Sequence, residues 1–195
     1  MGKKEKQELF YHVAEPLFER YGFRKTTVED ICREGAVSKR TFYELFSDKG
    51  DLFVRLVLYL AEKGIGEFVK HLPEDASGEE RIHALLDAYE KVVSEHPVYQ
   101  EFAADPGLIR QFGSIEPEMM QSPLVEQFES VLQHGIDRGE FRPMTPSLVT
   151  YIIFAILDGM FILAPQMSKE MGALNNPAMR NELRAFIVHA LKGGQ

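Results

Sequence analysis

Residues 22–52 read GFRKTTVEDICREGAVSKRTFYELFSDKGDL, and this stretch decides the fold of the N-terminal part of the chain. It predicts two short helices joined by a four-residue turn at residues 35–38, which is the spacing of a helix-turn-helix. Thr27 with Asp30 is typical of a capping box at the first helix, and Ser38 is a typical N-cap of the second. The positions where the two helices cross carry side chains that allow close packing: Ile31, Cys32, Ala36, Val37, Phe42 and Leu45.

Outside this stretch, apolar residues recur at intervals of three and four rather than two, so the sequence predicts an all-α protein. We expect about nine helices, divided into a three-helix N-terminal domain (residues 1–48) and a larger helical domain (residues 49–195). Thr27, Ser38, Ser77, Ser122, Thr145 and Asn176 are the predicted N-caps. The predicted helices are 4–21, 28–34, 38–46, 48–70, 78–96, one or two short helices within 98–121, and 123–138, 146–163 and 177–192.

The charge distribution permits DNA binding by the N-terminal part, although the net charge of the chain is −8. Residues 1–60 hold 11 basic and 10 acidic side chains, whereas residues 61–195 hold 11 and 20. The second helix of a helix-turn-helix presents its first turn to the major groove. The side chains able to meet bases or phosphates there are therefore Ser38, Lys39, Arg40 and Thr41.

Other classes of protein find less support in the sequence. Cys32 is the single cysteine, and no targeting segment is recognisable, so we expect a cytoplasmic location. The apolar stretch 148–164 contains Asp158, which favours a buried helix over a membrane span. We find no pattern for a cofactor or metal. Glu80 and His83 form one Glu-x-x-His element of the kind used by di-iron helical bundles, but no second copy exists. The alternative interpretation is a helical-bundle enzyme, or an interaction module with a degenerate DNA-binding domain.

Residues 13–57 resemble the N-terminal signature of the TetR/AcrR family of transcriptional regulators, through Gly22–Ile31 and Gly35–Leu52. The resemblance implies an all-helical homodimer whose C-terminal domain dimerises and binds a small-molecule effector. It further implies a repressor that the effector releases from a palindromic operator on double-stranded DNA. It does not identify the operator, the regulated genes or the effector.

The resemblance also assigns phosphate contacts to Thr26, Thr27, Tyr43 and Lys49. The sequence departs from the family pattern at three positions. Gly35-Ala36 stands where members commonly have Ala-Gly, so a left-handed residue at Ala36 would cost about 1 kcal/mol. Arg40 replaces a frequent glycine, and Leu45 replaces an aromatic residue or histidine. We therefore expect the sequence preference to be this protein's own.

The C-terminal domain offers candidates for two further surfaces. The predicted helix after Pro146 is apolar on nearly every side, and the last helix carries a broad apolar stripe, as expected of helices that meet a second subunit. The predicted dimer interface comprises Ala155, Gly159, Leu183, Phe186, Ile187 and Ala190. The candidate effector pocket comprises the aromatic residues of the middle helices and the acid Asp158: Phe68, Tyr89, Tyr99, Phe102, Phe112, Phe128, Tyr151, Asp158 and Phe161.

Overall fold

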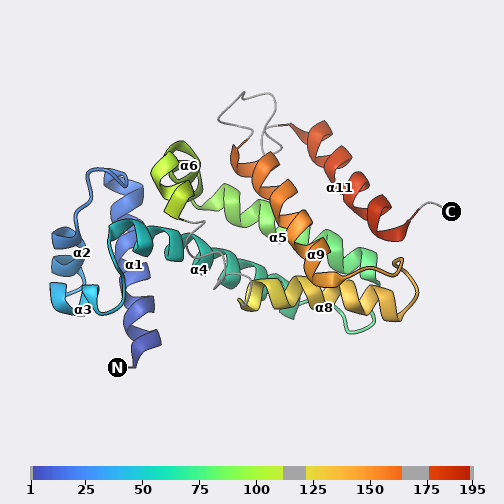
Figure 1. The fold of residues 1–195 in the computed structure, drawn as a ribbon, viewed down its shortest axis with the longest axis horizontal. Coiled ribbons are helices and arrows are strands. Elements are labelled where there is room, and N and C mark those ends of the chain that lie inside the picture. Colours follow the sequence, from blue (N-terminus) through green and yellow to red (C-terminus); the bar gives the residue numbers. More distant parts are fainter. Residues whose placement is uncertain (1, 112–121, 164–175, 194–195) are drawn as a thin grey trace. The chain divides into compact units, whose positions relative to one another are not determined.

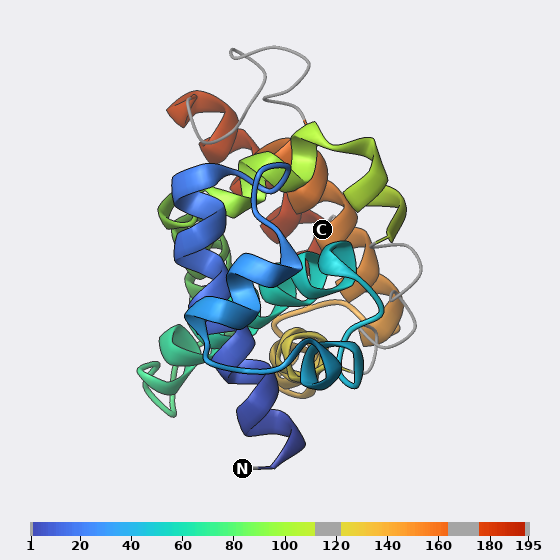
Figure 2. The ribbon, with the colours of Figure 1, turned by 90° about the vertical axis from the view of Figure 1, so that its left-hand side faces the viewer.

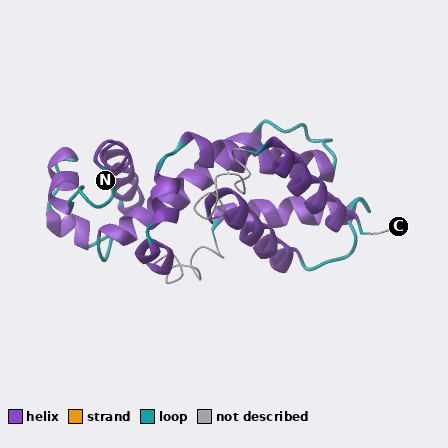
Figure 3. Cartoon of the chain, turned by 90° about the horizontal axis from the view of Figure 1, so that it is seen from above, coloured by secondary structure: helices purple, strands orange, loops and turns teal. Residues whose placement is uncertain are grey.

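A computed structural model describes residues 2–111, 122–163 and 176–193. Every regular element within these ranges is a helix, which confirms the predicted all-α class (Figure 1; Figure 3). The elements are α1 (Lys3–Tyr21), α2 (Val28–Glu34), α3 (Lys39–Tyr43), α4 (Lys49–Lys70), α5 (Gly78–Glu95), α6 (Val98–Ala104), α8 (Pro123–Asp137), α9 (Pro146–Leu157), the π-helix η1 (Asp158–Leu163) and α11 (Pro177–Lys192).

Local sequence determines where most of these helices begin. The side chains of Thr27, Ser38, Ser77 and Asn176 each accept a hydrogen bond from the backbone N–H three residues later, as the capping prediction requires. Thr145 occupies the N-cap position of α9, but its side chain makes no capping bond. The predicted N-cap position is therefore confirmed for Thr145, but α9 begins without a capping hydrogen bond from its side chain and with a proline in the first turn.

The chain divides into two compact units, residues 1–60 with 97–116 and residues 61–96 with 117–195. Helix α6 belongs to the first unit, where its side chains bond α4 and the loop between α1 and α2. The Tyr99 hydroxyl donates to the Val57 carbonyl over 2.8 Å, and the Phe23 N–H donates to the Glu101 carboxylate over 2.8 Å. The predicted domains, residues 1–48 and 49–195, have different bounds from these compact units. That domain division stays a prediction.

The core of the first unit is built mainly from phenylalanine. The ring of Phe10 on α1 makes edge-to-face contacts with Phe42 on α3 and with Phe46, at centroid distances of 5.5 and 5.6 Å. Phe18 and Phe53 form a second such pair at 4.9 Å. These contacts hold α3 and the start of α4 against α1, and α2 packs against both α1 and α3, which Figure 2 shows in shades of blue.

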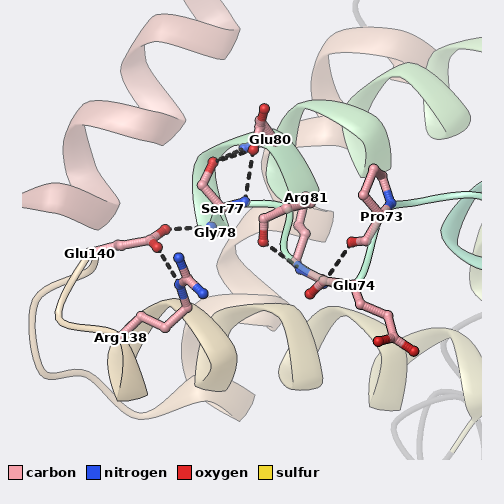
Figure 4. Close-up of polar contacts among 9 residues, drawn as sticks. Pro73, Glu74, Ser77, Gly78, Glu80, Arg81, Arg138 and Glu140 are labelled. Carbon is pink, nitrogen blue, oxygen red and sulfur yellow. Dashed lines mark hydrogen bonds and ion pairs between the residues drawn. The ribbon is translucent and has the colours of Figure 1, made fainter.

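In the second unit, α8 packs against both α5 and α9, and α11 packs against α5. Phe128 on α8 and Phe154 on α9 meet with their ring centroids 4.6 Å apart. The Glu140 carboxylate, beyond the end of α8, accepts a hydrogen bond from the Gly78 N–H at the start of α5 (Figure 4). Throughout the described ranges, each helix is too short or too polar to span a membrane.

Candidate nucleic-acid interface and ligand-binding unit

The turn between α2 and α3 is a Schellman motif with alanine at its left-handed position. Val37 N–H donates to the Cys32 carbonyl and Ala36 N–H donates to the Arg33 carbonyl, the two bonds that define the motif. Ala36 has a φ of 50° and is the only described non-glycine residue with a positive φ. Glycine is the usual residue there because it lacks the Cβ that makes this conformation costly. The left-handed conformation on which the expected strain at Ala36 depends is therefore present, and its cost stays a prediction.

Ala36→Gly is therefore expected to raise the free energy of unfolding by about 1 kcal/mol, because glycine adopts the required φ without strain. Chemical denaturation of the purified protein would measure this change. Gly139→Ala is the matched control, since Gly139 has a φ of 71° and open space around its Cβ position. The control should lose about the same free energy that Ala36→Gly gains. A destabilised Ala36→Gly variant would contradict the assignment.

Helix α3 presents its first turn to solvent. Ser38, Lys39 and Arg40 are exposed, and Thr41 is half-buried. Ser38 Oγ accepts a hydrogen bond from the Thr41 N–H over 3.1 Å, which fixes the start of the helix. Tyr43 stands at the other end of α3 with 58% of its surface exposed, and its ring packs edge-on against Phe42. Four of the predicted DNA-contacting side chains are therefore exposed together on one short helix and its N-cap.

The two basic side chains on this surface are paired with acids. Lys39 forms an ion pair with Glu29 on α2, and Arg40 Nε donates to Glu44 over 3.0 Å. The Arg40 side chain is 89% exposed, so its ion pair contributes little stability. Both cations can therefore exchange these acidic partners for DNA. The carboxylates of Glu29 and Glu44 would repel phosphate groups placed at the same positions.

Thr26 and Thr27 are engaged within the protein. Thr26 is 2% exposed, and its hydroxyl donates to the carbonyls of Leu17 and Gly22. The phosphate contact expected of the Thr26 hydroxyl is thus wrong, because this hydroxyl joins the end of α1 to the following loop. Thr27 is exposed, and its hydroxyl forms the capping box with Asp30.

Lys49 is likewise placed differently from the expectation. Its ammonium donates to the carbonyls of Phe23 (2.6 Å) and Thr26 (2.7 Å) and lies 4.3 Å from the centre of the Phe23 ring. Burial lowers the pKa of Lys49, and the nearby Glu101 carboxylate opposes that shift. The side chain thus ties the start of α4 to the loop before α2. The sequence did not reveal the Glu101 contact, because Phe23 and Glu101 lie 78 residues apart.

Cys32 lies in the interface between α2 and the other N-terminal helices and is 5% exposed. Burial raises the pKa of its thiol, which disfavours the reactive thiolate. Cys32 thus has the environment of a small packing residue, as the close helix crossing requires.

Within the second unit, three of the effector-pocket candidates meet. The Tyr89 hydroxyl on α5 donates to the Asp158 carboxylate, and the Tyr89 ring packs edge-on against Phe161 at 5.6 Å. Burial raises the pKa of Asp158 to about 6, while the Tyr89 hydrogen bond lowers it. Asp158 also marks the point where α9 widens into the π-helix η1, a feature that is frequent at functional sites.

We expect Asp158 to make the protein less stable as pH rises. The carboxyl has a pKa of about 6 in the folded protein against 3.8 when unperturbed, so the folded state holds its proton more tightly. Its stabilising contribution is complete below pH 3.8 and is lost as the pH rises through 6. Asp158→Asn should remove this dependence and add about 1 to 3 kcal/mol of stability at pH 8, measured by urea denaturation across pH.

Tyr89→Phe provides the companion measurement. Removing the hydroxyl that stabilises the carboxylate should move the midpoint of the same pH dependence upward. An unchanged pH profile in Asp158→Asn would show that Asp158 is not the titrating group.

The other effector-pocket candidates are dispersed. Tyr99 and Phe102 are buried in the first unit, on α6. Phe128 is buried against Phe154, and Tyr151 is 47% exposed. The half-buried ring of Phe68 lies 5.2 Å from the Lys91 ammonium, and Phe112 lies outside the described residues.

The predicted dimer residues fall into two groups. Leu183 and Ile187 are 8% and 3% exposed, so they already pack within their own subunit and are not available to a partner. Phe186 is 63% exposed, and Ala155 and Ala190 are also exposed. Gly159 is half-buried, with open space at its Cβ position. The structure adds three exposed apolar side chains on α9, which lie three, four or seven residues before Ala155: Leu148, Tyr151 and Ile152.

The Glu-x-x-His element of α5 has a structural role. The Glu80 carboxylate accepts from the N–H and hydroxyl of Ser77, completing the capping box at the start of the helix (Figure 4). His83 lies 3.8 Å from the Glu79 carboxylate at the surface. Glu80 and His83 thus bond different neighbours, Ser77 and Glu79.

Comparison with known proteins supports the interpretation of the N-terminal helices as a DNA-binding helix-turn-helix. Residues 10–56 match the family described as "Bacterial regulatory proteins, tetR family". The chain is 28% identical over 157 residues to the uncharacterised HTH-type transcriptional regulator YfiR of Bacillus subtilis (strain 168), covering 74% of this chain and 72% of YfiR.

Solved structures extend the similarity of fold along the chain. FadR of Bacillus subtilis in complex with stearoyl-CoA has a TM-score of 0.63 at 17% identity, covering 94% of this chain and 98% of FadR. RolR in complex with resorcinol has a TM-score of 0.68 at 19% identity, covering 97% of this chain and 88% of RolR. YfiR and FadR are both described as transcriptional regulators. Residues 10–56, which include the helix-turn-helix built by α2 and α3, thus match the TetR family, and the comparisons support a TetR-family transcriptional regulator.

Proposed function

We propose that the protein is a homodimeric repressor that binds a palindromic operator and is released from it by a small-molecule effector. The observation that carries the proposal is the exposed first turn of α3, where Ser38, Lys39 and Arg40 are free of the protein core. A helix-turn-helix inserts this turn into the major groove. Arg40 then reads a base, preferably guanine, and Tyr43 holds a phosphate.

Dimerisation follows in this proposal from the apolar surfaces of α9 and α11. Leu148, Tyr151, Ile152 and Ala155 lie on one face of α9 at intervals of three and four, and Phe186 and Ala190 stand four residues apart on α11. Exposed apolar side chains grouped in this way favour association with another surface. A second copy of the chain places two α3 helices on half-sites about one helical turn apart.

Effector response involves α4, which supplies residues to both compact units. Its first residue, Lys49, anchors the loop that precedes α2, and its last turns belong to the second unit. An effector that binds one arrangement of the second unit more tightly shifts the orientation of α4 and so the spacing of the two α3 helices. The ligand complexes of FadR and RolR support a small molecule as the effector.

Selection of bound sequences from random DNA tests the proposal. The wild-type protein should enrich a palindrome, and Arg40→Ala should lose preference at one base pair of each half-site, at a cost of about 1 to 3 kcal/mol. Tyr43→Phe is the contrasting variant, because loss of a phosphate contact should weaken all sequences alike. Absence of any enriched sequence at low salt would overturn the proposal, and a base preference altered by Tyr43→Phe alone would reverse the two roles.

A further inference from the structure

The helix-turn-helix has no net positive charge, which is unusual for a surface that meets DNA. Residues 27–46 carry four acidic and three basic side chains, a net charge of −1. Attraction between basic side chains and phosphate groups supplies essentially all of a protein's affinity for non-specific DNA. The two helices that meet the DNA in the proposed function are therefore poorly suited to bind DNA of arbitrary sequence.

Each basic side chain in this stretch is paired with an acid: Arg33 with Asp30, Lys39 with Glu29, and Arg40 with Glu44. Two of these pairs involve the exposed first turn of α3. The Glu29 carboxylate reaches Lys39 from α2, and the Glu44 carboxylate accepts from Arg40 Nε over 3.0 Å. The hydrogen bond between Lys39 and Glu29 lowers the pKa of the acid and raises the pKa of the lysine. Both groups of that pair therefore stay charged at neutral pH.

The two ion pairs of α3 are open to solvent. The side chains of Lys39 and Glu29 are 53% and 57% exposed, and that of Glu44 is 54% exposed. Ion pairs with this exposure contribute little to the stability of a fold. They do, however, place a negative charge beside each cation that the DNA would meet. The effect of the two acids should therefore appear in DNA binding rather than in stability.

We propose that Glu29 and Glu44 determine specificity by holding the two cations of α3 away from the phosphates of non-specific DNA. On the operator, a base replaces Glu44 as the partner of Arg40, and this contact offsets the loss of the ion pair. On other sequences no such base is present, so the acids keep the cations and repel the nearby phosphates. The inference rests on the DNA-binding function proposed above and adds the origin of its selectivity.

Affinity for a short duplex of random sequence is the first measurement. Glu29→Gln and Glu44→Gln each keep the size of the side chain and remove its charge. Each should raise the affinity for the random duplex by about three- to tenfold at about 0.1 M salt, because a cation is freed for phosphate. The dependence of this binding on salt should steepen by about one phosphate contact.

Affinity for the operator is the second measurement. Arg40 already contacts a base in the operator complex, so removing Glu44 gives it no new phosphate there. Operator affinity should therefore rise by less than affinity for the random duplex. The ratio of operator affinity to random-duplex affinity should fall at least about twofold in each acid variant.

Glu34→Gln is the matched control. Glu34 is exposed at the end of α2, and its carboxylate forms no ion pair with any residue that the structure describes. The same loss of charge there should change affinity for the random duplex by less than about twofold. Melting temperatures of all three glutamine variants should stay within about 2 °C of the wild type.

A double substitution tests whether Glu29 acts through Lys39. In a Lys39→Met background, Glu29→Gln should lose most of its effect on the random duplex, because the lysine that it would free is absent. An undiminished effect in that background would overturn the assigned role of the pair.

Three other results would also overturn the inference. They are an unchanged random-duplex affinity in both acid variants, an equal gain for operator and random duplex, and a gain in Glu34→Gln as large as in the acid variants. A change of base preference at one position in Glu44→Gln would show that Glu44 reads a base instead.

The random duplex requires no operator, so the two proposals fail separately. Stronger random-duplex binding by the acid variants, with no enriched sequence for the wild type, would support the electrostatic role of the acids and reject the proposed repressor. An enriched palindrome with unchanged random-duplex binding in the variants would leave the proposed function standing and reject this inference.

Discussion

Lys49→Met is expected to lower the free energy of unfolding by about 3 kcal/mol, equivalent to a fall of about 6 to 12 °C in melting temperature. The ammonium bonds the carbonyls of Phe23 and Thr26 at 2.6 and 2.7 Å and lies over the Phe23 ring. A methionine side chain has about the same length as lysine but no hydrogen-bond donor. The two partly buried carbonyls of Phe23 and Thr26 would therefore each lose a charge-assisted hydrogen bond. Calorimetry and urea denaturation would measure the change.

The same variant distinguishes an anchor from a phosphate contact. If Lys49 acts through the loop before α2, DNA affinity falls while the dependence of binding on salt keeps its slope. A lysine that binds phosphate would instead lower that slope by about one and leave stability within about 0.5 kcal/mol. Lys25→Met is the control, because Lys25 is an exposed lysine in the same loop and its removal should not change stability. An unchanged stability in Lys49→Met would restore the phosphate role.

Phe186→Glu is expected to weaken self-association at least about a hundredfold and to abolish operator binding at concentrations where the wild type is dimeric. Phe186 on α11 is 63% exposed and is the most exposed aromatic side chain of the proposed interface. Aromatic residues often carry most of the binding free energy of an interface, and a carboxylate buried there would have no partner. Sedimentation equilibrium would measure the association constant, and a gel shift would report DNA binding.

Tyr21→Glu is the control for this substitution. Tyr21 is an aromatic residue with 48% of its surface exposed, and it lies outside the proposed interface. Its replacement should leave the association constant unchanged. Tyr151→Glu on α9 should behave like Phe186→Glu if both helices meet the partner. A monomeric wild type, or a fully dimeric Phe186→Glu variant, would remove α11 from the interface.

The sequence predicted the features that depend on neighbouring residues. The N-caps at Thr27, Ser38 and Ser77 act through backbone groups three residues away, so the local pattern was sufficient to find them. The left-handed conformation of Ala36 was predictable because the turn demands a left-handed residue at one position. The all-α class follows from the periodicity of apolar residues, which reflects the geometry of the helix itself.

The tertiary structure decided the roles that depend on distant partners. The Thr26 hydroxyl and the Lys49 ammonium are suited to bind a phosphate. In the folded protein, however, both donate to backbone carbonyls of α1 and of the loop before α2. Glu101 reaches the Phe23 N–H from a helix far along the chain, and no local pattern marks that contact.

The same distinction applies to the apolar residues of the C-terminal helices. Periodicity identified Leu183, Phe186 and Ile187 as one stripe, yet only Phe186 faces solvent. The apolar stripe of α11 is wider than the surface that α11 buries against α5. The packing of α11 on α5 therefore determines which part of the stripe remains exposed. The sequence by itself therefore determined the helix-turn-helix and the side chains of its second helix, because their geometry is local. Only the tertiary structure decided which side chains remain available to DNA, to a ligand or to a second subunit, because availability depends on what the rest of the fold already occupies.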